Sequence, residues 1–328
     1  MYTFEEIKGC KQIKKNLQNA VTSGRVSHAY IINGGVGMGK KLLANTFAKT
    51  LQCEGKGSEP CGYCTSCKAF DTNNHPDVFY VSPQKTKGLG VHDIREQIIK
   101  NVEVKQYKYQ YKIFIVDKAD EMTVAAQNAL LKTLEEPPPY AVFLLLAKNI
   151  ESFLPTILSR CVTLKLRPLP NKTVEEFLLN QGLAQVGASG VFAEYAQGSI
   201  GQAIEMACSG DFTDMREDIL EKLTLIGKKD LVAVMAMAKE LEIYKDKLPF
   251  LDMIYLWYRD VLTAKKLGEE KYVIQKDKKD LIFRQASQET YGGLTKKLEA
   301  VWQAKGQLAQ NASFQLTIEI MLIKLKES

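Results

Sequence analysis

The feature that most constrains this chain is a glycine-rich segment, Gly34-Gly35-Val36-Gly37-Met38-Gly39-Lys40-Lys41. It follows the phosphate-binding pattern G-x-x-x-x-G-K-[ST], in which backbone N–H groups surround the phosphates, the lysine neutralises them and the final hydroxyl holds Mg2+. Gly34, Gly39 and Lys40 stand at the required positions, but Lys41 replaces the hydroxyl residue. An ammonium group cannot coordinate Mg2+. The segment therefore predicts the fold of a nucleotide-binding protein together with a defect in its chemistry.

The flanking residues favour a true phosphate loop. Residues 29–33 form a short apolar run, and beyond the loop apolar residues recur at helical spacing, at Leu42, Leu43, Phe47 and Leu51. A strand before the loop and a helix after it are the context that the motif requires. The alternative is a glycine-rich turn in another kind of α/β protein.

Length and composition indicate an ordinary soluble protein. The 328 residues are enough for two or three domains, and 45% hydrophobic with 25% charged residues is typical of globular chains. The net charge of +6 permits contact with nucleic acid but is too small to require it. Because the amino-terminal residues lack a signal core and no apolar run is long enough to span a membrane, we expect a cytoplasmic protein with no membrane contact.

Four cysteines form a candidate metal site. They follow the spacing C-x7-C-x2-C-x2-C, at Cys53, Cys61, Cys64 and Cys67. In a reducing compartment such spacing indicates tetrahedral zinc rather than disulfides. All four ligands would be thiolates, which leaves no open coordination position, so the zinc would be structural. The alternative is four unrelated buried thiols.

Strand and helix patterns alternate through the first half of the chain. Strands are expected at 78–81, 112–117, 142–147 and 162–166, and helices at 91–102 and 123–136. Such alternation predicts an α/β fold with a parallel sheet and helices on both faces. We expect three domains, namely 1–167 with the phosphate loop and the cysteine module (53–67), a small helical domain at 168–208, and an all-helical domain at 209–328.

The apolar run 112–116 ends in Asp117, whose carboxylate would approach a nucleotide-bound metal. In phosphate-loop ATPases of this kind a glutamate normally follows and polarises the attacking water. Lys118 stands there instead, and a cation cannot accept a proton from water. Lys41 and Lys118 are thus two separate losses of the same activity, and we predict that the chain does not hydrolyse ATP.

Several segments together resemble bacterial DNA polymerase III clamp-loader subunits of the AAA+ class. They are Ser27-His28-Ala29-Tyr30, the phosphate loop, the four cysteines, the acidic strand, the run 128–138 and Thr156-Ile-Leu-Ser-Arg-Cys161. The resemblance covers residues 1 to about 208 and implies that the first two domains form an AAA+ module with a helical lid. It also implies that the third domain is an oligomerisation collar.

Within that family the chain resembles the non-motor delta-prime type more than the gamma/tau motor. The motor would carry Ser or Thr at position 41 and Glu at 118. It would also carry an arginine near the γ-phosphate where Gly201 stands in Gly198-Ser-Ile-Gly-Gln-Ala203. The nucleotide site of Gly34, Gly39, Lys40 and Asp117 would therefore be degenerate. Whether it still binds ATP or ADP without hydrolysis is left open by the sequence.

The resemblance implies a catalytic role for Arg160, in trans, at the ATP of a neighbouring motor subunit. A guanidinium is always charged, and its forked donors suit the developing charge on a γ-phosphoryl group. A surface arginine at a helix end is the alternative. The implied partners are the gamma/tau and delta subunits and, through the complex, the sliding clamp and primer-template DNA.

The function expected from these features is that of a non-hydrolysing stator, which supports ATP-driven loading of the sliding clamp onto primed DNA. Such a chain would belong to a DNA-directed DNA polymerase holoenzyme without ATPase or polymerase activity of its own. One alternative is an ATP-hydrolysing gamma/tau-type motor. Another is a zinc-containing DNA-binding protein with a vestigial phosphate loop.

Overall fold

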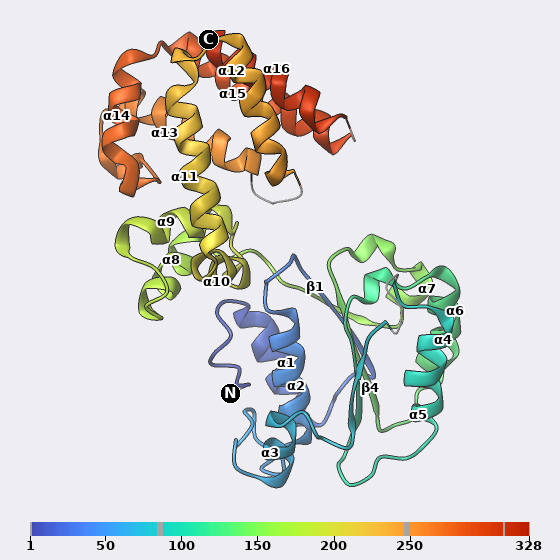
Figure 1. The fold of residues 1–328 in the computed structure, drawn as a ribbon. Helices are drawn as coiled ribbons and strands as arrows, with labels where there is room; N and C mark the ends of the chain where they lie inside the picture. Colours follow the sequence, from blue (N-terminus) through green and yellow to red (C-terminus); the bar gives the residue numbers. More distant parts are fainter. Residues whose placement is uncertain (1, 84–87, 246–249, 311, 328) are drawn as a thin grey trace. The chain divides into compact units, whose positions relative to one another are not determined.

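The computed structural model describes residues 2–83, 88–245, 250–310 and 312–327. The chain divides into two compact units, Met1–Pro168 and Leu169–Ser328. The first combines a sheet with helices, and the second is built from helices (Figure 1). Among the described residues, no helix combines the length and apolar character needed to cross a membrane.

The first unit contains a five-stranded parallel sheet with the order β2-β3-β4-β1-β5. The strands are β1 (Ala29–Asn33), β2 (Val78–Val81), β3 (Lys112–Val116), β4 (Ala141–Ala147) and β5 (Val162–Lys165). The helices are α1 (Lys11–Ser23), α2 (Lys40–Gln52), α3 (Thr65–Asp71), α4 (Val91–Ile94), α5 (Lys100–Val102), α6 (Val124–Glu135) and α7 (Pro155–Leu158). A π-helical turn, Arg95–Ile99, joins α4 to α5, so the predicted helix at 91–102 is present but is not a regular α-helix throughout.

Each face of the sheet has its own apolar core, because successive side chains of a strand point to opposite faces. On one face Ile32 and Leu144 pack in one cluster with Phe47 of α2. On the other face Phe114 and Phe143 stack with ring centroids 5.3 Å apart, in a cluster that also contains residues of α4 and α6. Figure 1 shows α1 and α2 on one side of the sheet and α4 to α6 on the other. The predicted parallel sheet with helices on both faces is confirmed.

The second unit has a single hydrophobic core in which Trp257 is fully buried. Its helices are α8 (Asn171–Asn180), α9 (Val186–Tyr195), α10 (Ile200–Cys208), α11 (Gly210–Leu225), α12 (Leu231–Glu240), α13 (Phe250–Leu267), α14 (Lys279–Gln288), α15 (Tyr291–Ala309) and α16 (Phe314–Glu327). Helices from both sides of residue 208 contribute to this core. The further division into a small helical domain and a collar domain stays a prediction.

A buried carboxylate fixes the loop that leads into strand β3. Asp77 follows α3 and is 1% exposed. Its side chain accepts hydrogen bonds from three consecutive backbone N–H groups, those of Tyr107 (2.6 Å), Lys108 (3.1 Å) and Tyr109 (3.1 Å). The carboxylate thus satisfies backbone donors that the sheet cannot reach.

We predict that Asp77→Asn lowers the free energy of unfolding by about 2–3 kcal/mol, because an amide presents NH2 to donors that need an acceptor. The measurement is urea unfolding followed by circular dichroism, with hydrogen–deuterium exchange at residues 107–109. Glu103→Gln is the matched control, since Glu103 lies exposed just before the same loop. Unchanged exchange at 107–109 in Asp77→Asn would contradict this account of the loop.

Candidate nucleotide, metal and arginine sites

The phosphate loop lies between the carboxyl end of β1 and the start of α2, as the motif requires. The N–H of Gly34 donates to the carbonyl of Ala147 at the end of β4 (3.1 Å), which ties the loop to the sheet. Gly37 and Gly39 adopt φ of 68° and 82°. Residues with a Cβ rarely adopt this left-handed conformation, so glycine is needed at both turns. The sequence therefore builds the backbone of a phosphate cradle.

Two hydrogen-bond donors of the phosphate loop are paired with other groups of the same loop. The ammonium of Lys40 donates to the carbonyls of Gly34 (2.6 Å) and Gly35 (2.7 Å). The N–H of Gly35 donates to the sulfur of Met38 at 3.1 Å. The lysine and one loop amide that would contact a phosphate are thus paired within the loop.

Two acidic residues and one basic residue surround Lys40. Burial lowers the pKa of Lys40, the carboxylates of Asp120 and Asp117 act to raise it, and the ammonium of Lys148 acts to lower it. Asp117 was predicted from the sequence, whereas Asp120 and Lys148 were not. Asp120 also accepts from the backbone N–H groups of Lys148 (3.0 Å) and Asn149 (3.2 Å), which joins the end of β3 to the end of β4.

Lys41 and Lys118 stand where a hydrolysing site would have a hydroxyl residue and a glutamate. Lys41 is exposed on the first turn of α2, and Lys118 is exposed with a left-handed backbone just after β3. Neither side chain offers an oxygen to a metal. Gly201 lies near the start of α10 in the second unit. The described loop therefore has the backbone conformation of a phosphate-binding loop, and the ammonium of Lys40 is bonded to loop carbonyls.

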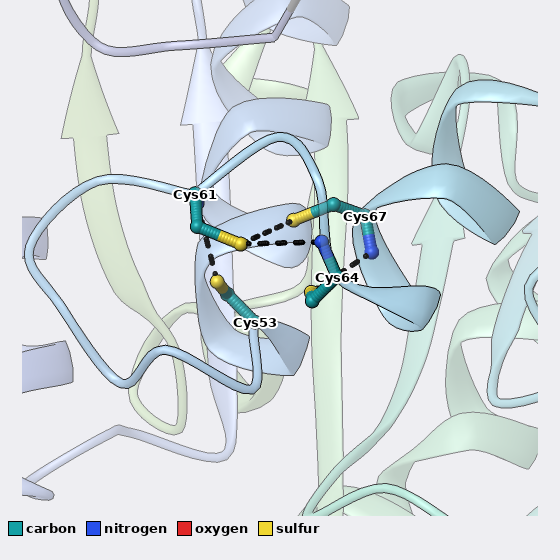
Figure 2. Close-up of side chains that lie close together, drawn as sticks. All are labelled: Cys53, Cys61, Cys64 and Cys67. Carbon is teal, nitrogen blue, oxygen red and sulfur yellow. Dashed lines mark hydrogen bonds between the residues drawn. The ribbon is translucent and has the colours of Figure 1, made fainter.

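The four cysteines converge on one point (Figure 2). Cys53 follows α2, Cys61 lies in the following loop, Cys64 caps α3 and Cys67 lies in its first turn. All four sulfurs lie within 4.8 Å of one another, and those of Cys61 and Cys67 are 4.0 Å apart. A tetrahedral zinc site with Zn–S bonds of about 2.3 Å would place its sulfurs about 3.8 Å apart. The donor set and its spacing therefore fit a closed tetrahedral metal site.

Backbone N–H groups point at three of the sulfurs. The N–H of Cys61 donates to Cys53 (3.3 Å), that of Cys64 to Cys61 (3.4 Å) and that of Cys67 to Cys64 (3.4 Å). Burial would raise the pKa of the Cys61 thiol, but hydrogen bonds with the N–H groups of Tyr63 and Cys64 and with the side chains of Cys64 and Cys53 outweigh it and bring that pKa to about 7. For Cys53 and Cys67 burial dominates and raises the pKa of the thiol. Donors of this kind stabilise thiolates, which are the form that binds metal.

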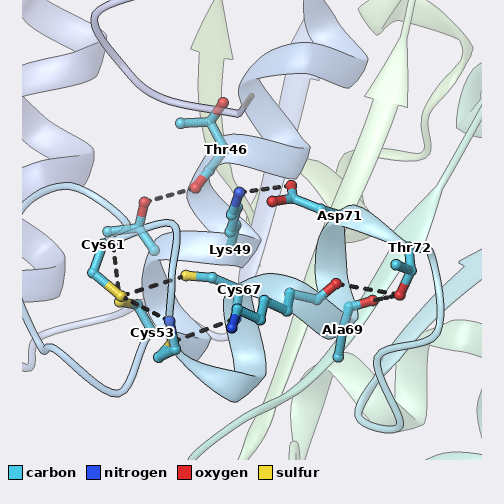
Figure 3. Close-up of polar contacts among 11 residues, drawn as sticks. Thr46, Lys49, Cys53, Cys61, Cys67, Ala69, Asp71 and Thr72 are labelled. Atoms are coloured by element: carbon cyan, nitrogen blue, oxygen red, sulfur yellow. Dashed lines mark hydrogen bonds and ion pairs between the residues drawn. The ribbon is translucent and has the colours of Figure 1, made fainter.

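The cysteine module is joined to the rest of the first unit by partly buried polar contacts, one of which is drawn in Figure 3. Lys49 of α2 is 1% exposed and pairs with Asp71 of α3 at 2.6 Å. In the loop between Cys53 and Cys61, Glu59 accepts from the N–H of Phe4 (2.9 Å) and from the amide of Gln18 (2.8 Å). A metal held by the four cysteines would therefore also stabilise contacts to α1, α2 and the amino-terminal segment.

Arg160 follows the short helix α7. The sequence predicts only that this residue closes a helix. One guanidinium nitrogen donates to the carbonyl of Thr156 (2.9 Å) and the hydroxyl of Ser159 (3.1 Å). A second nitrogen pairs with a carboxylate oxygen of Glu135 at 2.8 Å. No local pattern in the sequence predicts this ion pair, because Glu135 and Arg160 lie 25 positions apart.

Comparisons with known proteins identify the same family that the motifs of this chain resemble. A sequence model of the family described as "DNA polymerase III, delta subunit" matches residues 9–170. The Bacillus subtilis DNA polymerase III subunit delta′ is 31% identical over 321 residues, covering 96% of this chain and 96% of that protein. The chain belongs to the family of DNA polymerase III clamp-loader subunits.

Sequence similarity to another DNA polymerase III subunit also extends over most of the chain. The Bacillus subtilis DNA polymerase III subunit tau is 28% identical over 310 residues, which are 87% of this chain and 54% of that longer protein. A solved DNA polymerase III gamma subunit-related protein from Thermotoga maritima is 19% identical, with a TM-score of 0.42 over 96% of this chain and 98% of that one. Membership of the family confirms the resemblance and the AAA+ fold class expected from it.

We predict that the protein carries about one metal ion per chain on its four cysteines. Cys61→Ser should lower the metal content strongly and should reduce the resistance of residues 53–71 to proteolysis. The matched control is Cys208→Ser, since Cys208 is exposed in the second unit and lies outside the cluster. The measurement is elemental analysis of protein purified without added metal. A fully folded, metal-free protein with four titratable thiols would contradict the prediction.

Proposed function

We propose that this protein is the non-hydrolysing, delta-prime-type subunit of a clamp loader, which supports ATP-driven loading of the sliding clamp onto DNA in the cytoplasm. The observation that carries the proposal is the combination of a phosphate loop without its metal hydroxyl, an acidic strand without its base, and an arginine at the end of α7. The first two features remove hydrolysis from this chain, and the third supplies a group for hydrolysis elsewhere.

The state of the phosphate loop supports the non-hydrolysing role. Lys40 is held by the carbonyls of Gly34 and Gly35. A nucleotide would have to displace these bonds while gaining no Mg2+ ligand from Lys41. Binding of ATP or ADP, if it occurs, would therefore be weak and would not lead to turnover.

The proposed role for Arg160 is to contact the γ-phosphate of ATP bound by a neighbouring subunit. Its side chain is 33% exposed, at the end of a helix, so a partner can reach it. A planar guanidinium can donate two parallel hydrogen bonds to a phosphoryl group, which a lysine cannot do. The partners that this role requires are motor subunits of the gamma/tau kind, together with delta, and through them the clamp and primer-template DNA.

We further propose that the metal is zinc and that it is structural. Four thiolates without an oxygen or nitrogen donor favour zinc over harder cations and leave no position for substrate. The ion pair between the buried ammonium of Lys49 on α2 and the partly exposed carboxylate of Asp71 in the metal-binding segment supports a role in stability. Elemental analysis identifies the ion, and any majority metal other than zinc would contradict this assignment.

A motor role is the competing candidate, because tau is 28% identical over 87% of this chain. We predict that the purified chain alone shows no ATP turnover above background, since Lys41 and Lys118 replace the metal ligand and the base. The measurement is steady-state phosphate release, with Lys40→Ala as control. Turnover that Lys40→Ala abolishes would identify the chain as a motor and would overturn the stator proposal.

We predict that Arg160→Ala leaves assembly intact and lowers the clamp- and DNA-stimulated ATPase of the complex. Arginine fingers contribute about 10^3 to 10^5 in rate at a single site, but the whole complex should lose much less because other sites remain active. Arg160→Lys should restore little of the loss, because an ammonium lacks the planar fork.

The measurement is ATP turnover and clamp loading by reconstituted complexes of verified equal composition. Arg25→Ala is the matched control, because Arg25 is an exposed arginine in the same unit. Wild-type rates with Arg160→Ala would show that Arg160 is a surface residue without a role in trans.

A further inference from the structure

The ion pair between Arg160 and Glu135 lies at the carboxyl ends of two helices. Glu135 is the last residue of α6, and Arg160 comes two residues after α7. The guanidinium uses one nitrogen for α7, through the Thr156 carbonyl and the Ser159 hydroxyl, and another for the carboxylate of Glu135. The nitrogen that faces Glu135 therefore already holds an anionic oxygen from its own chain.

We infer that Glu135 is a positioning residue that stands in for the neighbour's phosphate and competes with it for Arg160. A carboxylate and a phosphoryl group both accept the forked donors of arginine, so one can replace the other at the same nitrogen. The bonds to Thr156 and Ser159 use the other nitrogen and can persist during the exchange. This inference rests on the proposed function of Arg160 in trans.

The exposure of the pair suits an exchange. The side chains of Arg160 and Glu135 are 33% and 47% exposed, so water and salt weaken their attraction. Exposed pairs of this kind shift a two-state population by about fivefold at most. Such a pair is strong enough to order the guanidinium and weak enough for a multiply charged phosphate to displace it.

The pair therefore lowers the unstimulated rate of ATP hydrolysis at the neighbour's site. While Arg160 is bound to Glu135, the neighbour lacks its transition-state contact and hydrolysis is slow. When the subunits close on clamp and DNA, the phosphate displaces the carboxylate. Removing the carboxylate should raise the unstimulated rate and leave the stimulated rate nearly unchanged, so that the ratio between them falls.

The test is Glu135→Gln in the reconstituted complex, because glutamine keeps the shape and removes the charge. We expect ATP turnover without clamp and DNA to rise by up to about fivefold, the limit for an exposed ion pair. The increase should shrink as salt is added, because salt already weakens the pair in the wild type. A purely structural glutamate would instead give an unchanged or lower rate, and either result would overturn the inference.

Glu136→Gln is the matched control, since Glu136 is the adjacent exposed glutamate and makes no side-chain ion pair within the described ranges. It should leave both rates unchanged. An equal rise in Glu136→Gln would show a general effect of charge at the end of α6 and would count against a specific role for Glu135.

The double variant Glu135→Gln/Arg160→Ala separates the two proposals. If Glu135 acts through Arg160, the glutamine substitution adds nothing once Arg160 is absent. If Arg160→Ala alone leaves the stimulated rate intact, the proposed function is wrong and this inference with it. If Arg160→Ala lowers that rate while Glu135→Gln leaves the unstimulated rate unchanged, the proposed function stands and only this inference is overturned.

Discussion

A parallel sheet brings the carboxyl ends of all its strands to one edge, and the candidate nucleotide site of this protein depends on that constraint. The order β2-β3-β4-β1-β5 places the ends of β1, β3 and β4 next to one another. The phosphate loop, Asp117 and Asp120, and Lys148 follow these three strands and surround Lys40 as a result. The site thus combines a glycine-rich loop, a lysine and two acidic residues, while Lys41 and Lys118 stand where the phosphate-loop motif and its acidic strand would carry a hydroxyl residue and a glutamate.

Two cationic side chains that could contact a phosphate, those of Lys40 and Arg160, are bonded to oxygen atoms of their own chain. Lys40 is bonded to the carbonyls of Gly34 and Gly35, and Arg160 to Glu135, Thr156 and Ser159. The two sets of contacts differ in burial and in the kind of partner. Burial lowers the pKa of Lys40 and its partners belong to the loop itself, whereas the partner of Arg160 is an exposed side chain that a phosphate can replace. The first set of contacts lies within one loop, and the second joins the ends of α6 and α7 through an exposed ion pair.

Local patterns predicted the sheet well, because buried parallel strands are short apolar runs. The strands expected at 78–81 and 112–117 are observed at Val78–Val81 and Lys112–Val116. The cysteine cluster was also predictable, since its ligands lie close in sequence. The Glu135–Arg160 pair, the place of Asp120 beside Lys40 and the three N–H groups on Asp77 were not. Each depends on residues that only the folded chain brings together, and no periodicity marks such contacts.

We propose above all that this chain completes a neighbour's ATP site rather than its own. Trapping ADP with aluminium fluoride tests it most directly, because this transition-state mimic depends on the arginine that contacts the transferring phosphoryl group. Bound nucleotide would be counted in assembled complexes that contain either the wild-type chain or Arg160→Ala. The account predicts one fewer trapped nucleotide for each copy of the variant chain. Equal numbers in the two complexes would contradict it.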